Sequence, residues 1–262
     1  MRILHVTDFH FCQPWFEWLG SHASEYDAVC FTGDFVTLFM DPQLFGTDSK
    51  PSSLTRLMRT TRVSNMRAQV RWIRDWLSNW PSKTPLFLCS GNHDYWPQQE
   101  HFIDTDAEGG WLRNARRPGI IWTDGSEPTL IATHRFLCVP WGRTPNPQTT
   151  EPHIVLVHAP PANTDVASKR GNDAGGDIEV TQAAQGFPPG SILLCGHVHQ
   201  PRCWHAQIMN PLSGKPIWAF NPGYGATDMA EPNFIVLDTI ARRAEYHAAG
   251  EVQSLSLPRV TE

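Results

Sequence analysis

The stretch LFLCSGNHDYW (residues 86–96) joins a short apolar run to a cluster of polar side chains. Four apolar residues in succession, Leu86–Cys89, are typical of a strand that is buried on both faces. A turn after such a strand can use a glycine such as Gly91, but it does not need an amide, an imidazole and a carboxylate in a row. Those three groups belong to Asn92, His93 and Asp94. Their succession therefore indicates that this strand end has a functional role.

Four more apolar runs have the same form, and polar residues follow each of them. These runs are Ile3–Val6, Val29–Phe31, Ile154–Val157 and Ile192–Cys195. Because the carboxyl ends of the strands in an open α/β sheet face a common crevice, we expect the side chains after all five runs to meet there. The side chains in question are Asp8, His10, Asp34, Asn92, His158, His197 and His199.

The rest of the chain predicts the fold class. Apolar residues at steps of three and four predict a helix between the second and third runs, and they are Met66, Val70, Ile73, Leu77 and Trp80. Short strand patterns in residues 120–141 and 203–247 predict hairpins. Together these patterns predict an α/β layered sandwich with a mixed sheet, built as a single domain over residues 1–262.

Two polar stretches, residues 41–62 and 160–177, are predicted to be loops. Long loops in compact domains are often functional, so residues 41–62 are a candidate lid or loop insertion. The alternatives are a solvated helix face for the arginines of the first stretch and a plain connector for the second. The arginines are Arg56, Arg59 and Arg62.

Composition and charge narrow the class of protein. The chain has 262 residues, of which 40% are hydrophobic and 18% charged, as in ordinary globular proteins. Its net charge of −5 gives no overall attraction to nucleic acid or to an anionic membrane. The six scattered cysteines are expected to be reduced core residues rather than a disulfide framework. With no segment of the form of a signal peptide or membrane span, we expect a cytoplasmic protein without membrane attachment.

The predicted cluster has the ligand types of a site for two divalent metal ions. Carboxylate, imidazole and amide groups bind hard or borderline ions, and seven of them are too many for one ordinary site. Two ions carry a charge of +4, which two carboxylates and a bridging hydroxide reduce to +1, so the site would attract phosphate. Two metals about 3.5–4 Å apart can hold a hydroxide and stabilise an in-line displacement.

The order of these motifs resembles the calcineurin-like metallophosphoesterases, in particular small bacterial phosphohydrolases and class III cyclic-nucleotide phosphodiesterases. The motifs that carry the resemblance are Asp8-x-His10, Gly33-Asp34, Gly91-Asn92-His93-Asp94, His158 and Gly196-His197-x-His199. Further similarities are Pro140-Trp141-Gly142, the sequence HAPP from His158, and Asn221-Pro222-Gly223. The resemblance implies a four-layer α/β/β/α sandwich with mixed sheets, which is the metallo-dependent phosphatase fold, and a dinuclear metal centre.

The resemblance also implies a role for each residue of the cluster. One ion would be held by Asp8, His10, Asp34 and His199. The other would be held by Asp34, Asn92, His158 and His197, so that Asp34 bridges the two. His93 would stand near the leaving-group oxygen as a general acid or as a stabiliser of developing charge, with Asp94 as its orienting partner. The ions could be Mn, Fe, Zn or Mg.

The leading hypothesis is a hydrolase of small phosphoric esters that uses a metal-bridging hydroxide, with mono- and diesters both open. A nuclease is an alternative, although the acidic net charge weighs against nucleic acid as a partner. A non-catalytic scaffold of the same fold and a histidine-rich structural zinc protein are further alternatives. The oligomeric state is not indicated. Candidates for substrate contact, which could equally pack in the core or face solvent, are Phe11, Trp15, Phe16, Tyr95, Trp96, Arg56, Arg59, Arg62 and Arg143.

Overall fold

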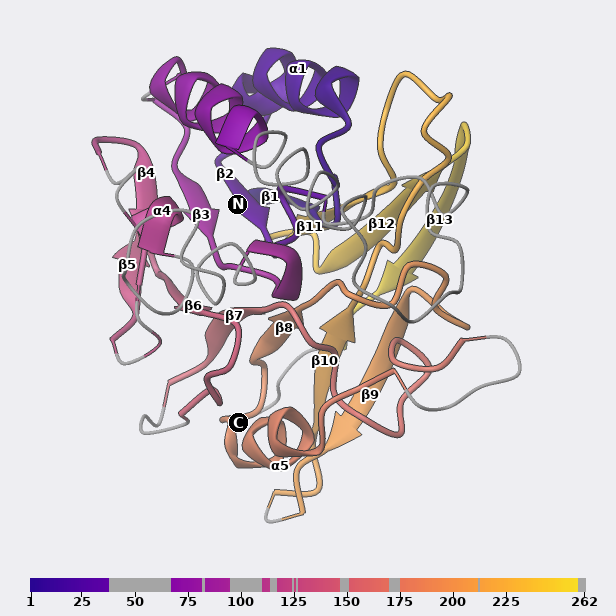
Figure 1. Cartoon of the computed structure of the whole chain (residues 1–262). Helices are drawn as coiled ribbons and strands as arrows, with labels where there is room; N and C mark the ends of the chain where they lie inside the picture. Colours follow the sequence, from indigo (N-terminus) through magenta and orange to yellow (C-terminus); the bar gives the residue numbers. More distant parts are fainter. Residues whose placement is uncertain are drawn as a thin grey trace, which may run out of the picture.

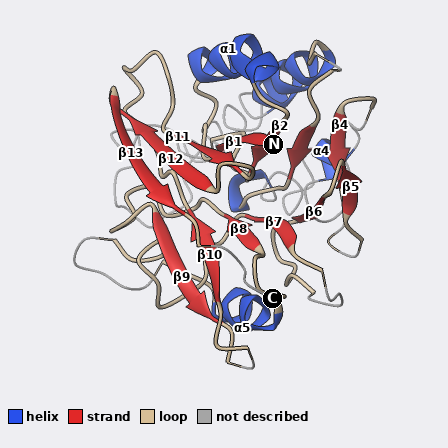
Figure 2. Ribbon diagram, turned by 180° about the vertical axis from the view of Figure 1, so that it is seen from behind, coloured by secondary structure: helices blue, strands red, loops and turns tan. Residues whose placement is uncertain are grey.

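Two β-sheets pack face to face, and helices cover their outer faces (Figures 1 and 2). The computed structural model describes residues 1–37, 67–81, 83–94, 110–113, 117–123, 125, 127–146, 151–169, 175–211 and 213–258. The candidate lid, residues 41–62, lies outside the described residues. Within the described part, the layers follow the order helix, sheet, sheet, helix, which confirms the predicted α/β/β/α sandwich.

The first sheet has seven strands in the order β13-β12-β11-β1-β2-β3-β4. Its parallel half runs from β1 to β4, with Ile3 opposite Ala28 and Val29 opposite Leu86. Its other half is antiparallel. The strands are β1 (Arg2–Val6), β2 (Ala28–Phe31), β3 (Leu86–Leu88), β4 (Ile120–Trp122), β11 (Phe234–Asp238), β12 (Arg243–Ala248) and β13 (Glu251–Ser256).

The second sheet has six strands in the order β5-β6-β7-β8-β10-β9. The four central strands are parallel, and β5 and β9 pair with them antiparallel at the two edges. The strands are β5 (Thr129–Ile131), β6 (His134–Val139), β7 (His153–Val157), β8 (Ile192–Leu194), β9 (His205–Met209) and β10 (Pro216–Phe220).

The helices pack against the two sheets through apolar faces, one of which the sequence predicts. Helix α1 (Gln13–His22), followed by the short η1 (Ala23–Glu25), and the helix over residues 67–78 cover the first sheet, at the top of Figure 1. The predicted apolar stripe is confirmed, since Val70, Ile73 and Leu77 are almost fully buried, while Met66 lies outside the described residues. Helix α5 (Ile178–Gly186) covers the second sheet, and α4 (Gly110–Arg113) is a single turn.

The predicted hairpins are only partly correct. β5 and β6 form a hairpin, as do β9 with β10 and β11 with β12. However, β4 pairs in parallel with β3 in the first sheet, although β5 follows it in the chain. A run of apolar residues predicts a strand but not the sheet that it joins. The strand β13 was not predicted, because its residues are mostly polar and exposed.

The described part of residues 160–177 forms turns closed by a bridge between Pro161 and Asp177, in line with the predicted loop. All six cysteines are free thiols. Among the described residues, no helix is both long enough and apolar enough to cross a membrane.

Candidate metal centre

The polar side chains at the strand ends gather as the sequence predicts. Asp8 follows β1, Asp34 follows β2, and residues 92–94 form a helical turn after β3. In the second sheet, His158 follows β7 directly and residues 197–199 come after β8. The two sheets therefore deliver ligands to one place from opposite sides.

The first group of predicted ligands consists of two carboxylates and two imidazoles. Asp8, His10, Asp34 and His199 each offer one ligand atom, and these atoms all lie within 4.8 Å of one another. Nε2 of His199 is 3.4 Å from Oδ1 of Asp8. Nε2 of His10 is 2.9 Å from Nε2 of His199. Two imidazole nitrogens that face each other next to two carboxylates form a suitable set for a divalent cation.

The second group shares Asp34 with the first. Nε2 of His158 lies 3.3 Å from Oδ2 of Asp34 and 3.1 Å from Oδ1 of Asn92. Nδ1 of His197 lies 3.0 Å from the same Asn92 oxygen. Oδ2 of Asp34 also lies 3.7 Å from Nε2 of His10, so this oxygen faces both groups of ligands.

Neighbouring hydrogen bonds aim these atoms at the centre. Nδ1 of His158 donates to the carbonyl of Thr32 at 2.7 Å, which leaves its Nε2 with a free lone pair. Oδ2 of Asp8 accepts from the Thr7 hydroxyl and from the His197 amide at 2.7 and 2.9 Å. Oδ1 of Asp8 is buried and has no hydrogen-bond partner among the described residues. A buried carboxylate oxygen without a donor is suited to a metal ion.

The electrostatics of the site favour positive charge. Burial alone would raise the pKa of Asp8, but His10, His199 and His158 lower it well below its usual value. Burial also lowers the pKa of His158, yet the carboxylate of Asp34 outweighs this effect and raises that pKa to about 9. The residues therefore fit a group that carries positive charge, as metal ions do.

The backbone at the site is strained. Asp8, His10, Asp34 and His197 have φ angles of 54°, 45°, 59° and 66°, in the left-handed region that non-glycine residues seldom adopt. Strain of this kind persists only where the surrounding structure enforces it, and it is concentrated at functional sites. Four of the seven predicted ligands adopt it, which supports a functional reason for their arrangement.

Two glycines allow the loops to approach each other closely. A Cβ atom on Gly91 would lie 2.1 Å from Oδ1 of Asp34. A Cβ atom on Gly196 would lie 1.9 Å from the Thr7 hydroxyl oxygen and 2.4 Å from Oδ2 of Asp8. Both distances are far below van der Waals contact, so any side chain at either position would displace a predicted ligand.

The structure gives Asp94 a task that differs from the expected one. Its carboxylate accepts hydrogen bonds from four backbone amides, those of Asp34, Phe35, Val36 and Gly91, at 2.8 to 3.3 Å. These bonds occupy the four lone-pair positions of the carboxylate, so Asp94 ties the loop after β2 to the loop after β3. The expectation that Asp94 orients His93 stays a prediction.

His93 lies beside the first group of ligands. Its amide donates to Oδ1 of Asp34 at 2.9 Å, and its Nε2 is 4.0 Å from Oδ2 of the same residue. Its ring makes an edge contact with the ring of His10, with 4.6 Å between centroids. Burial lowers the pKa of His93 to about 4.

Sequence reasoning did not assign a role to two aromatic residues at the site. The Trp141 ring lies against His158 and His197, with centroids 5.6 and 5.5 Å away. The Tyr224 ring lies against His10 and His199 at 5.4 and 5.1 Å. Each half of the cluster therefore has an aromatic wall. The only signal in the sequence was that both residues lie in or next to the weaker motifs, Pro140-Trp141-Gly142 and Asn221-Pro222-Gly223.

Asn221 is a third residue without an assigned role, and it holds the loop that carries His197 and His199. Its fully buried side-chain amide donates to the carbonyls of Val166, Gly196 and Val198 at 3.0 to 3.1 Å. Its side-chain oxygen accepts from the amide of Gly223 at 2.8 Å. The side chain thereby fixes the loop after β8.

The candidates for substrate contact fall into three groups. Trp15 and Phe16 are fully buried in the core, and Phe11 packs on its edge against Trp72, which agrees with the packing alternative. Arg143 is exposed and lines a cavity of about 330 Å³ with Trp141 and His158. The remaining candidates lie outside the described residues, and they are Arg56, Arg59, Arg62, Tyr95 and Trp96.

The family model for calcineurin-like phosphoesterases matches residues 1–201, which include every residue of the cluster. The chain belongs to the calcineurin-like phosphoesterase family. It is therefore a metallophosphoesterase, a metal-dependent hydrolase of phosphoric esters. The strand-end motifs thus identified the family correctly from the sequence.

Solved structures resemble the chain over nearly its whole length. One structure superposes with a TM-score of 0.56 at 11% identity, and the match covers 98% of this chain and 99% of the other. The protein TT1561 of Thermus thermophilus has a TM-score of 0.49 at 13% identity, with 97% and 98% covered. The phosphoesterase YfcE from E. coli has a TM-score of 0.40 at 13% identity, with 98% and 100% covered. No curated protein matches the chain by sequence.

Proposed function

We propose that this metallophosphoesterase hydrolyses small phosphoric esters at a centre for two divalent ions that share Asp34. The observation that carries the proposal is the position of Oδ2 of Asp34, which lies 3.7 Å from Nε2 of His10 and 3.3 Å from Nε2 of His158. One carboxylate oxygen thus faces both groups of ligands. Asp8, His10 and His199 would complete one site, and Asn92, His158 and His197 the other.

When bound, the two ions would supply a hydroxide nucleophile and positive charge for the phosphate oxygens. The chain itself holds the ligand atoms in place before substrate arrives. The hydrogen bond from His158 to Thr32, and those that Asp8 accepts from Thr7 and His197, fix the direction of these ligands. Little reorganisation is then needed when the charge of the transition state develops.

His93 would act on the leaving group. Its ring lies at the edge of the cluster, next to His10, and it is not among the proposed metal ligands. From there it can donate a proton or a hydrogen bond to the oxygen that departs from phosphorus. Asp94 supports this arrangement by holding together the two loops that follow β2 and β3.

The cavity beside Trp141 is a candidate site for part of the substrate. It has a volume of about 330 Å³, and its lining includes His158, Arg143 and Glu179. This volume suits a small ester rather than a polymer. The convergence of all seven proposed ligands also counts against a non-catalytic scaffold, which has no need to retain them.

The proposal is tested by metal analysis and a hydrolysis screen. Protein reconstituted separately with Mn, Fe, Zn and Mg would be assayed for bound metal and for turnover of phosphomonoesters, phosphodiesters and cyclic nucleotides. We expect close to two ions per chain and turnover that depends on them. A single tightly bound zinc without turnover on any ester would contradict the dinuclear hydrolase.

A further inference from the structure

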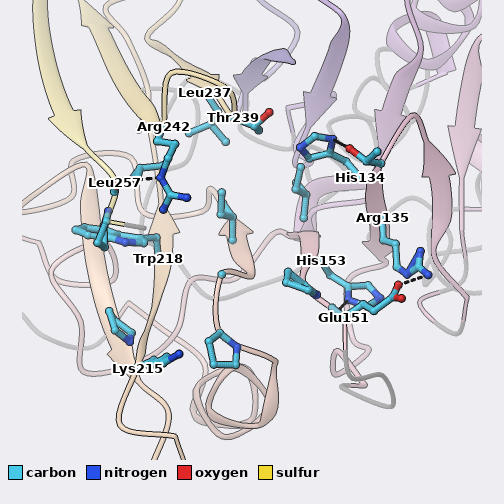
Figure 3. A pocket seen from close by; sticks show the side chains of 18 of the residues that line it. His134, Arg135, Glu151, His153, Lys215, Trp218, Leu237, Thr239, Arg242 and Leu257 are labelled. Carbon is cyan, nitrogen blue, oxygen red and sulfur yellow. Dashed lines mark hydrogen bonds and ion pairs between the residues drawn. The ribbon is translucent and has the colours of Figure 1, made fainter. Parts of the chain in front are cut away.

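A second cavity lies at the opposite ends of the strands that carry the metal ligands (Figure 3). It has a volume of about 560 Å³ and opens between the two sheets. His153 and Ile192, at the starts of β7 and β8, line it, whereas His158 and His197 lie beyond the ends of these strands. His158 is five residues from His153, which is roughly 16 Å along an extended strand. The cavity is therefore separate from the metal centre.

The walls of this cavity are mainly apolar and flat. The indole of Trp218 and four prolines contribute rigid surfaces, and leucine and isoleucine side chains fill the space between them. A pocket of this size with apolar walls suits a small molecule that has an aromatic or compact apolar body. The apolar residues that line the cavity include Trp218, Ile154, Ile192, Leu237 and Leu257.

A hydrogen-bond donor in this wall has no acceptor. The side chain of Trp218 is only 9% exposed, and its indole N–H has no hydrogen-bond partner among the described residues. A buried indole N–H usually finds a partner, because leaving it unpaired is unfavourable. The nitrogen itself is almost inaccessible to solvent, so Trp218 contributes ring surface to the cavity rather than a donor for the ligand.

The charged groups around the cavity favour an anion. The guanidinium of Arg242 points into the cavity in Figure 3. Within the part of the chain that the structure describes, its hydrogen bond runs from Nε to the carbonyl of Leu257 at 3.4 Å, which leaves the terminal nitrogens for a ligand. Lys215 adds a second cation on the same side. On the other side, Arg135 is paired with Glu151. The carboxylate of Asp238, a further acidic group at the cavity, accepts hydrogen bonds from two backbone amides at 2.8 and 2.9 Å.

We infer that this cavity is a binding site for a small aromatic anion, with the ring against Trp218 and the carboxylate, sulfonate or phosphate on Arg242. An arginine binds such groups through two parallel hydrogen bonds, and it does so more strongly where apolar walls exclude water. The site is distinct from the metal centre and has no part in the hydrolysis itself.

The test uses the fluorescent probe 8-anilino-1-naphthalenesulfonate with the metal-loaded protein. We expect saturable binding at one site. Arg242→Gln should weaken it about tenfold, because a charge-assisted hydrogen bond is lost, while Arg242→Lys, which keeps the charge but not the paired hydrogen bonds, should weaken it less. The matched control is Arg243→Gln, since Arg243 pairs with Glu245 and does not line the cavity. That control should change affinity by less than about twofold.

Two further measurements locate the probe. Leu257→Trp should fill part of the cavity from its edge and reduce binding, with the fold checked by circular dichroism. N-phenyl-1-naphthylamine, a neutral counterpart of the probe, should bind equally to the parent and to Arg242→Gln. Equal losses in Arg242→Gln and Arg243→Gln, equal binding of the charged probe by Leu257→Trp and the parent, or no saturable binding would each overturn the inference.

Discussion

Oδ2 of Asp34 lies 3.3 Å from Nε2 of His158, although the two residues come from different sheets. Asp34 follows β2 of the first sheet, and His158 follows β7 of the second. Their contact joins the two halves of the sandwich at the centre of the site. The other Asp34 oxygen accepts from the His93 amide at 2.9 Å, so the carboxylate cannot turn without breaking that bond.

Asp34→Asn should therefore impair both metal sites at once. Loss of the charge should lower the metal content below two ions per chain. Losing a residue that only hydrogen-bonds to a metal ligand typically lowers activity roughly 10- to 100-fold. Turnover of Asp34→Asn should fall by more than this. Metal content and turnover would be measured on the same preparation. Asp165→Asn is the control, because Asp165 is exposed and pairs with Arg202 away from the metal centre. Full retention of two ions would argue against a shared carboxylate.

His93→Ala should leave the metal content unchanged, because His93 is not a proposed ligand. Turnover should fall most for esters with poor leaving groups, since these depend on a proton or hydrogen bond from the enzyme. The measurement is a series of phenyl esters that differ only in the pKa of the leaving phenol. An equal loss across the series would count against a role at the leaving group, and it would favour a role in positioning substrate.

Gly91→Ala should act like a substitution of Asp34, although it adds only one methyl group. That group would lie 2.1 Å from Oδ1 of Asp34, so the carboxylate or the backbone must move. We expect metal binding to weaken and stability to fall by about 1–3 kcal/mol, as in overpacked cores. The control is Gly20→Ala in α1, where the nearest atom is an ordinary 3.5 Å away and φ is not positive. A Gly91→Ala protein with full metal content would contradict this account.

Asn221→Ala tests how the loop after β8 is held. The change would remove the donor that three buried carbonyls share, and we expect a loss of roughly 3 kcal/mol in the free energy of unfolding. Turnover at saturating metal should also fall, because His197 and His199 lose their support. Urea unfolding and turnover would be compared with Asn79→Ala, which removes a single hydrogen bond from an exposed side chain. Equal effects of the two substitutions would contradict the role of Asn221.

The clustering of the proposed metal ligands could be predicted from the sequence because each lies in the loop that follows a buried strand. Five buried runs ending in Asp, His or Asn are a local pattern, and the rule that parallel strands end at one edge brings them together. The rule applies within one sheet, and here the strand ends of both sheets meet, since Asp34 after β2 and His158 after β7 are in contact. That these side chains bind metal stays a prediction.

The remaining features depend on contacts between distant segments. The amides that Asp94 binds at Asp34 and Phe35 are about sixty residues away in the chain, and an Asp beside a His gives no sign of them. β4 belongs to the first sheet because it pairs with β3. Local sequence patterns do not specify which strand pairs with which. The cavity at Trp218 is formed by residues of five strands, their adjoining loops and the chain after β13, so no single motif marks it.

His5 should make the protein less stable in acid. It is fully buried in β1, with Nε2 3.0 Å from the Thr32 hydroxyl, and burial lowers its pKa to about 3. The unfolded chain binds a proton at this residue near pH 6.5, whereas the folded protein does not. Its stabilising contribution is therefore fully present above pH 6.5 and is lost as pH falls toward 3, by roughly 1.4 kcal/mol per pH unit.

His5→Gln isolates this effect, because glutamine can keep the hydrogen bond to Thr32 but does not titrate. Urea unfolding of both proteins would be followed at pH 7, 6, 5 and 4 at the same metal concentration. The metal ligands titrate alike in both, so the difference in unfolding free energy reports His5 alone. It should shift steadily in favour of His5→Gln below pH 6.5. A difference that stays constant across this range would show that His5 is protonated in the folded protein as readily as in the unfolded chain.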